Sequence, residues 1–73
     1  MNKLDILRGL ISSVLKIPED AIGLEDGIQK TPGWDSLAHV SIMVGIEREF
    51  GVEIDERLMN CRTVAELLDS LPD

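Results

Sequence analysis

Three side chains in this 73-residue sequence suggest covalent or proton-transfer chemistry: Ser36, His39 and Cys61. A catalytic serine needs a base within hydrogen-bond distance and a third group that orients the base. His39, the only histidine, lies three residues after Ser36 on the apolar side of the helix predicted there. We therefore expect His39 to connect the preceding loop to that helix through a ring nitrogen, and we predict no catalytic residue. No set of histidine, cysteine and carboxylate residues has the spacing of metal ligands.

Cys61 and Trp34 each have two interpretations. Cys61 could be a thioester site, but its only evident basic neighbours are Arg57 and Arg62, and a small side chain that is at least half buried is favoured. Trp34 could be an exposed anchor for a partner, because interfaces are enriched in tryptophan. It could equally cover the apolar ends of the helices and position the turn before Ser36, and this packing role is slightly favoured.

Ser36 directly follows Gly33, Trp34 and Asp35, and we predict that a helix begins there. A helix N-terminus presents unpaired backbone N–H groups and the positive end of the helix dipole. Both would stabilise a phosphate esterified to a hydroxyl at this position. The alternative is that Ser36 or Asp35 serves only as the N-cap.

The spacing of apolar residues predicts three main helices and one short helix, with no strands. The first helix begins after an N-cap at Asn2 and ends before Pro18, because the residue before a proline avoids the helical conformation. The second helix covers residues 36–50 and ends at Gly51. The inward face of the first helix contains Leu4, Leu7, Leu10, Ile11, Val14 and Leu15.

A short helix is expected at residues 55–60, with Asp55 as its N-cap. The last helix opens with a capping box, in which the Thr63 hydroxyl meets the Glu66 N–H and the Glu66 side chain reaches back. Pro72 ends this helix. Its inward face contains Val64, Leu67, Leu68 and Leu71. Together these elements predict an all-α, irregular bundle with a long first loop.

That loop covers residues 17–35, where glycine and proline recur and the helical pattern disappears. A short helical turn is expected at residues 19–22. Ile22, Leu24 and Ile28 are isolated apolar residues that should anchor the loop over the helices. A connection of this length in a small domain is more often functional than not.

The helix at residues 36–50 carries two apolar stripes. Ile42, Met43, Ile46 and Phe50 form one, and Leu37, Val40 and Val44 lie roughly opposite. One stripe must face the core, and so small a domain cannot easily bury the other. We expect the short helix to cover the second stripe in part, leaving a contact surface with Leu37 and Val44 at its rim. The alternative is complete cover by the short helix.

Charge and composition restrict the partners. Fourteen acidic and seven basic residues give a formal net charge of −7. We therefore predict that the chain does not bind nucleic acids and that its partners are proteins with basic surfaces. The single cysteine provides no disulfide framework, the first residues do not resemble a signal peptide, and the apolar runs are too short to span a membrane. We expect one domain over residues 1–73, cytoplasmic and monomeric.

Asp35-Ser36-Leu37 precedes an amphipathic helix that ends in the sequence EFGVEI at residues 49–54, and this arrangement closely resembles the acyl and peptidyl carrier protein family. The similarity covers nearly the whole chain, including the long loop and the helix that begins at Thr63. It implies an acyl-carrier-protein-like bundle without catalytic activity. It also implies that a phosphopantetheinyl transferase moves the 4′-phosphopantetheine arm of coenzyme A onto Ser36. The thiol of the arm would then carry cargo as a thioester.

Carriers of this family dock on successive enzymes through the helix that begins at the modified serine. Transferred to this sequence, the resemblance implies partner contacts by Asp35, Leu37, Val40, Val44, Glu47, Ile54 and Leu58. Ile54 and Leu58 would flank the arm or its cargo. The implied partners are the transferase, an acyl- or aminoacyl-loading ligase, and downstream synthases and transferases.

Some residues differ from the fatty-acid-synthesis carriers. Ala38 and Ser41 stand where those carriers place acidic residues, and Arg48 interrupts the usual acidic run. Trp34 and His39 are also unlike that subtype. The sequence is thus more similar to the stand-alone carriers of specialised polyketide, peptide and aminoacyl pathways. An acyl cargo is the first expectation and an aminoacyl or peptidyl cargo the second, while an unmodified helical interaction adaptor is the alternative function.

Overall fold

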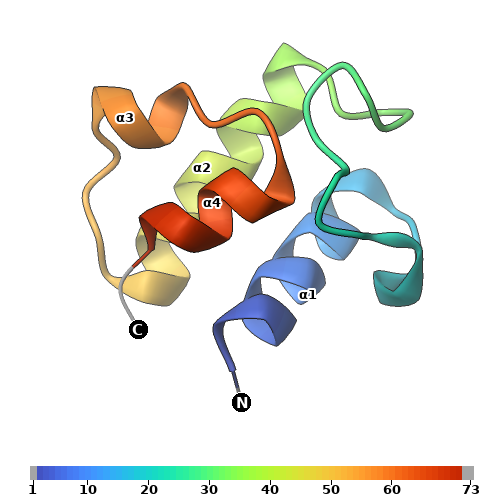
Figure 1. Ribbon diagram of the computed structural model, residues 1–73, viewed down its shortest axis with the longest axis horizontal. Coiled ribbons are helices and arrows are strands. Elements are labelled where there is room, and N and C mark those ends of the chain that lie inside the picture. Colours follow the sequence, from blue (N-terminus) through green and yellow to red (C-terminus); the bar gives the residue numbers. More distant parts are fainter. Residues whose placement is uncertain (1, 72–73) are drawn as a thin grey trace.

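The computed structural model describes residues 2–71. Its elements are α1 (Lys3–Leu15), the 3-10 turn η1 (Glu19–Ala21), α2 (Ser36–Phe50), α3 (Glu56–Met59) and α4 (Val64–Ser70) (Figure 1). Within the described residues, β-type pairing is limited to one isolated bridge between Gly27 and Thr63. The predicted all-α bundle of three main helices and one short helix is confirmed.

The N-caps of α1, α3 and α4 are those that the sequence predicts, and at α2 the cap is Asp35, one of the two candidates. Four side chains accept the backbone N–H three residues later, over 2.8–3.2 Å: Asn2, Asp35, Asp55 and Thr63. The Glu66 side chain of the α4 capping box reaches back as predicted, and its Oε1 accepts the N–H of Arg62 over 2.6 Å. The helix end predicted at Pro72 lies outside the described residues.

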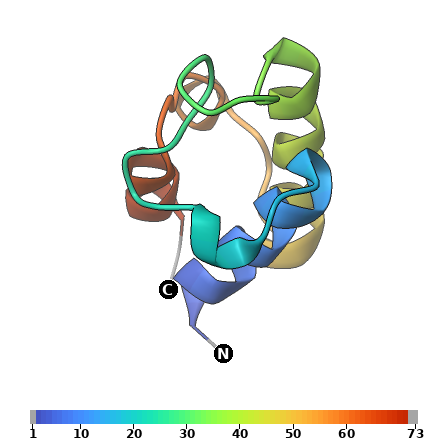
Figure 2. The ribbon, with the colours of Figure 1, turned by 90° about the vertical axis from the view of Figure 1, so that its right-hand side faces the viewer.

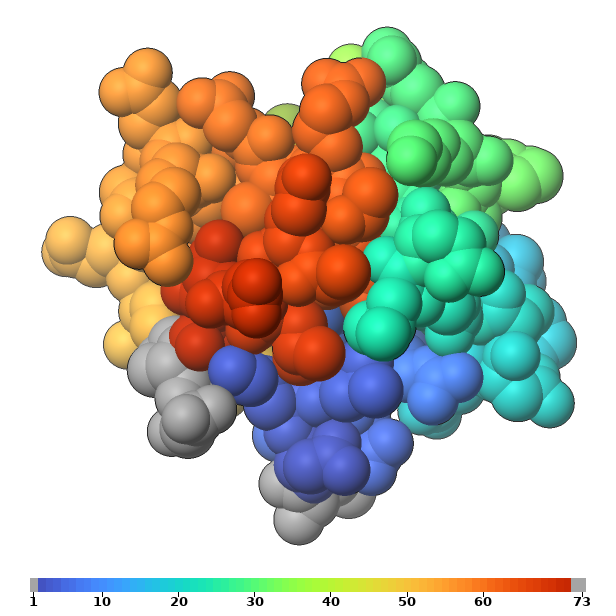
Figure 3. Space-filling view, in the orientation of Figure 1, coloured from blue at the N-terminus to red at the C-terminus, as the bar shows by residue number. Residues whose placement is uncertain are grey.

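The inward faces of α1, α2 and α4 form the core. Its fully buried side chains include Leu7 and Ile11 of α1, Ile42 and Ile46 of α2, and Val64 and Leu67 of α4. On the face shown in Figure 3, α4 covers the centre and is bordered by α1 and by the long loop. Lys3 Nζ donates to the Leu71 carbonyl over 3.0 Å and so connects the first turn of α1 to the end of α4.

The long loop lies beside α4 in both ribbon views (Figures 1 and 2). The backbone N–H groups of Val64 and Ala65 donate to the carbonyls of Asp26 and Leu24 over 2.8 and 3.0 Å. The loop carbonyls therefore accept hydrogen bonds from N–H groups in the first turn of α4, which have no acceptor within the helix. These bonds hold the loop in place independently of its apolar side chains.

Two of the three predicted loop anchors are confirmed. Ile22 is fully buried and Ile28 is half buried against the core. The prediction for Leu24 is wrong, because its side chain is exposed. Leu24 contributes to the attachment of the loop through its carbonyl oxygen, and this bond to Ala65 does not require the side chain to face inward.

Candidate functional site

Ser36 is the first residue of α2, and its side chain is exposed. The residue before it, Asp35, is the N-cap: Asp35 Oδ1 accepts the N–H of Ala38 over 2.9 Å. The Ser36 hydroxyl makes no hydrogen bond to any other residue in the described range 2–71. The structure thus assigns the cap to Asp35 and leaves the Ser36 hydroxyl accessible for a covalent bond.

Backbone donors without partners occur at the start of α2, where Ser36 stands. Ser36 and Leu37 occupy the first two positions of a 15-residue helix, where N–H groups have no partner within the helix. The next two N–H groups are already bonded, that of Ala38 to the Asp35 side chain and that of His39 to the Asp35 carbonyl. Two donors and the positive end of the helix dipole therefore remain for an anion attached to Ser36. A phosphate ester fits this position.

The turn before Ser36 has a defined conformation. Gly33 has a φ of +86°, which side chains other than glycine rarely adopt. Trp34 N–H donates to the Thr31 carbonyl over 3.0 Å, and the Trp34 carbonyl accepts the N–H of Gln29 over 2.9 Å. Thr31 is itself buried, and its hydroxyl donates to Asp26 Oδ1 over 2.8 Å. These bonds position the chain that leads into α2.

Trp34 and His39 connect the loop to two helices. Trp34 is 2% exposed, and its indole Nε1 donates to His39 Nδ1 over 3.0 Å. An indole N–H can only donate, so His39 Nδ1 carries no proton and Nε2 is the protonated nitrogen. That nitrogen lies 3.3 Å from the carbonyl oxygen of Met59 at the end of α3. The packing role of Trp34 and the connecting role of His39 are confirmed, and neither ring nitrogen is available to Ser36.

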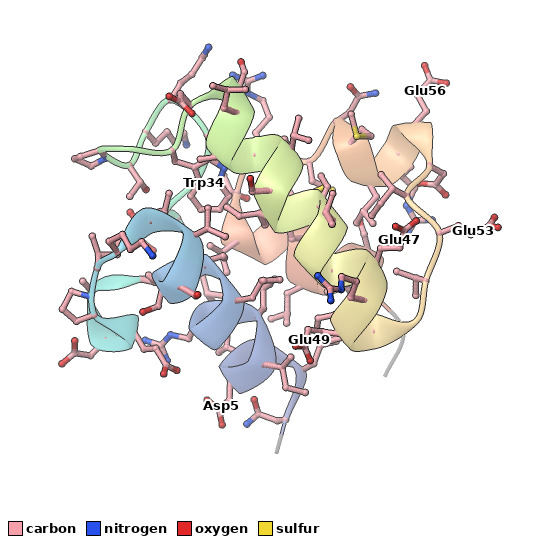
Figure 4. All side chains as sticks on the ribbon, turned by 180° about the vertical axis from the view of Figure 1, so that it is seen from behind. Asp5, Trp34, Glu47, Glu49, Glu53 and Glu56 are labelled. Atoms are coloured by element: carbon pink, nitrogen blue, oxygen red, sulfur yellow. The ribbon has the colours of Figure 1, made fainter. Side chains whose placement is uncertain are left out.

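Most of the predicted contact residues are exposed. Leu37, Val40 and Val44 are 80%, 51% and 47% exposed and form what we call the α2 stripe. Complete cover of this stripe by α3 is therefore excluded. Asp35 and Glu47 are also exposed, whereas Ile54 is half buried against the core. Figure 4 shows Glu47 projecting from the second half of α2.

Leu58 does not belong to this surface. It is 5% exposed and packs in the core, so the prediction that it contacts partners is wrong. The next residue of α3, Met59, is 46% exposed instead. Because the Met59 carbonyl lies beside His39, the end of α3 adjoins the first turns of α2. Met59 is thus an exposed apolar residue near the α2 stripe that the sequence did not identify.

Cys61 is buried, as the favoured interpretation predicted. Its Sγ lies 3.5 Å from the Arg57 carbonyl and 3.4 Å from Ser70 Oγ. In the part of the chain that the structure describes, no three histidine, cysteine or carboxylate side chains are grouped so that they could hold a metal ion. None of the described helices is long and apolar enough to cross a membrane.

The sequence matches the family model of the phosphopantetheine attachment site over residues 5–71. Acyl carrier protein 3 of Ralstonia nicotianae is 40% identical over 53 residues, which cover 73% of this chain and 61% of that protein, less than two thirds of its length. The acyl carrier protein of Campylobacter jejuni subsp. doylei is 31% identical over 75 residues, covering 97% of each chain. That of Thermosynechococcus vestitus is 32% identical over 73 residues, covering 94% of this chain and 90% of the relative.

Proposed function

The chain belongs to the acyl carrier protein family, whose cofactor is covalently attached 4′-phosphopantetheine, and we propose that Ser36 is the residue that holds this arm. The observation that carries the proposal is the position of the Ser36 hydroxyl, which is exposed and without a hydrogen-bond partner among the described residues. Two other serine hydroxyls are engaged: Ser12 Oγ donates to the Ile17 carbonyl, and Ser70 Oγ contacts Cys61. Ser13 and Ser41 are exposed like Ser36, but neither stands at the start of a helix.

The residues around Ser36 have separate tasks in this proposal. Ser36 supplies the hydroxyl oxygen of the phosphodiester, and the N–H groups of Ser36 and Leu37 stabilise its negative charge. Asp35 caps the helix without occupying the hydroxyl. When bound, the arm supplies a thiol that holds the cargo as a thioester. The chain itself then needs no catalytic residue, and we propose that it is a non-catalytic carrier.

Partner enzymes approach Ser36 over the adjoining surface. We propose that a phosphopantetheinyl transferase, a loading ligase and downstream synthases or transferases contact the α2 stripe, together with Asp35, Glu47 and Met59. Ile54, half buried beside this surface, would lie next to the arm or its cargo. The α2 stripe is exposed, and contiguous exposed apolar residues usually mark a contact site.

The cargo class is the finer part of the proposal. Because residues 38 and 41 are alanine and serine, α2 presents no carboxylate at either position. Ala38 is half buried and Ser41 is exposed. Arg48 is exposed as well and lowers the negative charge near Glu47. This surface supports a specialised stand-alone carrier with an acyl cargo, and an aminoacyl cargo as the second class. We further propose that residues 1–73 act as one monomeric, cytoplasmic carrier domain.

The test compares three proteins: the wild type, Ser36→Ala and Ser41→Ala. Ser41 is the matched control because it is also an exposed serine of α2. Each protein is incubated with coenzyme A and a phosphopantetheinyl transferase, and its intact mass is measured. The wild type and Ser41→Ala should each gain one arm, and Ser36→Ala should gain none while its helical circular dichroism is retained. An arm on Ser36→Ala would overturn the assignment, and a wild type without an arm would favour the adaptor function.

A further inference from the structure

A groove lies between α1, η1 and the end of α2, remote from Ser36. It is lined by Asp5, Ile6, Gly9, Leu10, Ser13, Glu19 and Glu49, and we call it the α1 groove. Glu49 follows Ser36 by 13 residues within α2. At 1.5 Å per residue, that separation corresponds to about 20 Å along the helix. The α1 groove is therefore a second surface, distinct from the α2 stripe.

The floor of the α1 groove is apolar. Ile6 and Leu10 are only half buried there, and Gly9 between them has no side chain. A Cβ atom at Gly9 would lie 3.7 Å from Glu19 Oε1, so a larger side chain at this position would extend towards the wall formed by η1. Leu10 packs closely against α2, since a Cβ atom on Gly45 would lie only 2.2 Å from Leu10 Cδ1. The groove thus has an apolar floor that is only partly covered.

The rim of the groove is acidic. Asp5 of α1, Glu19 of η1 and Glu49 of α2 are all exposed, and none forms an ion pair with a residue between positions 2 and 71. No lysine or arginine lines the groove. Figure 4 shows Asp5 and Glu49 at the same end of the molecule. Three carboxylates from three elements therefore lie around an apolar floor, and the described residues that line it include no cation.

We propose that the α1 groove binds a basic amphipathic segment of a partner protein. An apolar side chain of that segment would lie on Ile6 and Leu10, and flanking lysines or arginines would pair with the carboxylates of the rim. Charge complementarity selects this occupant. A second copy of the chain would bring another net charge of −7, and anionic lipids or nucleic acids would be repelled in the same way.

Because the α1 groove is remote from Ser36, a partner can bind there without blocking the carrier site. A partner held at the α1 groove leaves Ser36 and the α2 stripe uncovered. The carrier could then stay attached to one protein while Ser36 is presented to another, which would raise the effective concentration of the carrier at that enzyme. Binding at the groove does not itself require Ser36, so this inference and the proposed function can fail separately.

The probe is a synthetic helical peptide with one leucine flanked by lysines on the same face. A scrambled peptide of identical composition, in which the leucine and the lysines no longer share a face, is its control. Each peptide is titrated into the ¹⁵N-labelled full chain, and backbone amide shifts are followed by NMR. We expect saturable shifts centred on Ile6, Gly9 and Ser13 with the amphipathic peptide, and at least about tenfold weaker binding of the scrambled one.

Two variants test the floor and the rim. Gly9→Leu fills the groove without changing charge and replaces a helix-interior glycine with a better helix former. The double variant Glu19→Gln/Glu49→Gln removes two charges from the rim. Its matched control is Glu53→Gln/Glu56→Gln, which removes two exposed charges outside the groove. Gly9→Leu and the rim variant should each weaken binding by about tenfold or more, and the control pair by less than about threefold.

Arm attachment by the transferase is measured on every variant and should be unchanged, which shows that the carrier site remains intact. The inference is overturned if the amphipathic peptide does not bind, or if its shifts centre on the α2 stripe. It is also overturned if the scrambled peptide binds as tightly as the amphipathic one. The same holds if Glu53→Gln/Glu56→Gln weakens binding as much as Glu19→Gln/Glu49→Gln does, because binding would then depend on net charge alone.

Discussion

The indole Nε1 of Trp34 donates a hydrogen bond to Nδ1 of His39 over 3.0 Å, and both side chains are buried. This single bond joins the loop that precedes Ser36 to the first turn of α2. The other ring nitrogen of His39 continues the connection to the Met59 carbonyl in α3. The two residues therefore couple the proposed attachment site to the short helix beside it.

A double-mutant cycle measures this coupling. His39→Leu should lower the free energy of unfolding by about 1–3 kcal/mol, because the buried indole N–H loses its acceptor. The same substitution in a Trp34→Phe background should cost less, since no donor is left unpaired there. Urea denaturation of the four proteins gives the coupling energy. Equal costs in the two backgrounds would show that the hydrogen bond contributes nothing beyond packing.

Gly27 is expected to be sensitive to the smallest substitution. A Cβ atom at Gly27 would lie 1.7 Å from the Arg62 carbonyl oxygen, a backbone atom that cannot move without shifting the chain before α4. Gly27→Ala should therefore lower the free energy of unfolding by about 1–3 kcal/mol or more. Gly23→Ala is the control, because its Cβ would meet only the Glu25 side chain at 3.4 Å. If thermal melts show both variants unchanged, the loop does not approach α4 as closely as described.

Substitutions on the two sides of α2 should separate docking from stability. Ile46 is fully buried, and Ile46→Ala should cost about 2–5 kcal/mol of stability. Val44 is 47% exposed, so Val44→Arg should alter stability little, while weakening arm transfer by the transferase and cargo transfer by later enzymes. Thermal melts and transfer rates are measured for both. A Val44→Arg protein that unfolds while Ile46→Ala melts normally would reverse the assignment of the two faces.

The sequence predicts the helices well because their ends depend on local interactions. Asp35 and Thr63 cap α2 and α4 through N–H groups only three residues away, so a short stretch of sequence contains both partners. The apolar face with Ile42 and Ile46 follows equally from helical spacing. These signals were sufficient to place Ser36 at a helix start, next to an exposed stripe.

The wrong predictions concern residues whose burial or attachment depends on tertiary packing, which the local sequence does not reveal. Leu58 and Met59 are adjacent apolar residues of one short helix, and only the packing of α3 determines which of them is buried. Leu24 is attached through its backbone, which no side-chain pattern reveals. The close approach at Gly45 depends on which residue of α1 lies opposite. The α1 groove was missed for the same reason, since its three acidic residues come from separate elements.

Localisation of the arm on the wild-type protein tests the central claim most directly. Trypsin cleaves after Lys30 and Arg48 and releases residues 31–48, a peptide that contains the hydroxyls of Thr31, Ser36 and Ser41. After arm attachment, fragmentation of this peptide in the mass spectrometer assigns the added mass to one residue. We predict that the phosphopantetheine is found on Ser36 alone. An arm on Thr31, on Ser41 or on a different peptide would contradict the account.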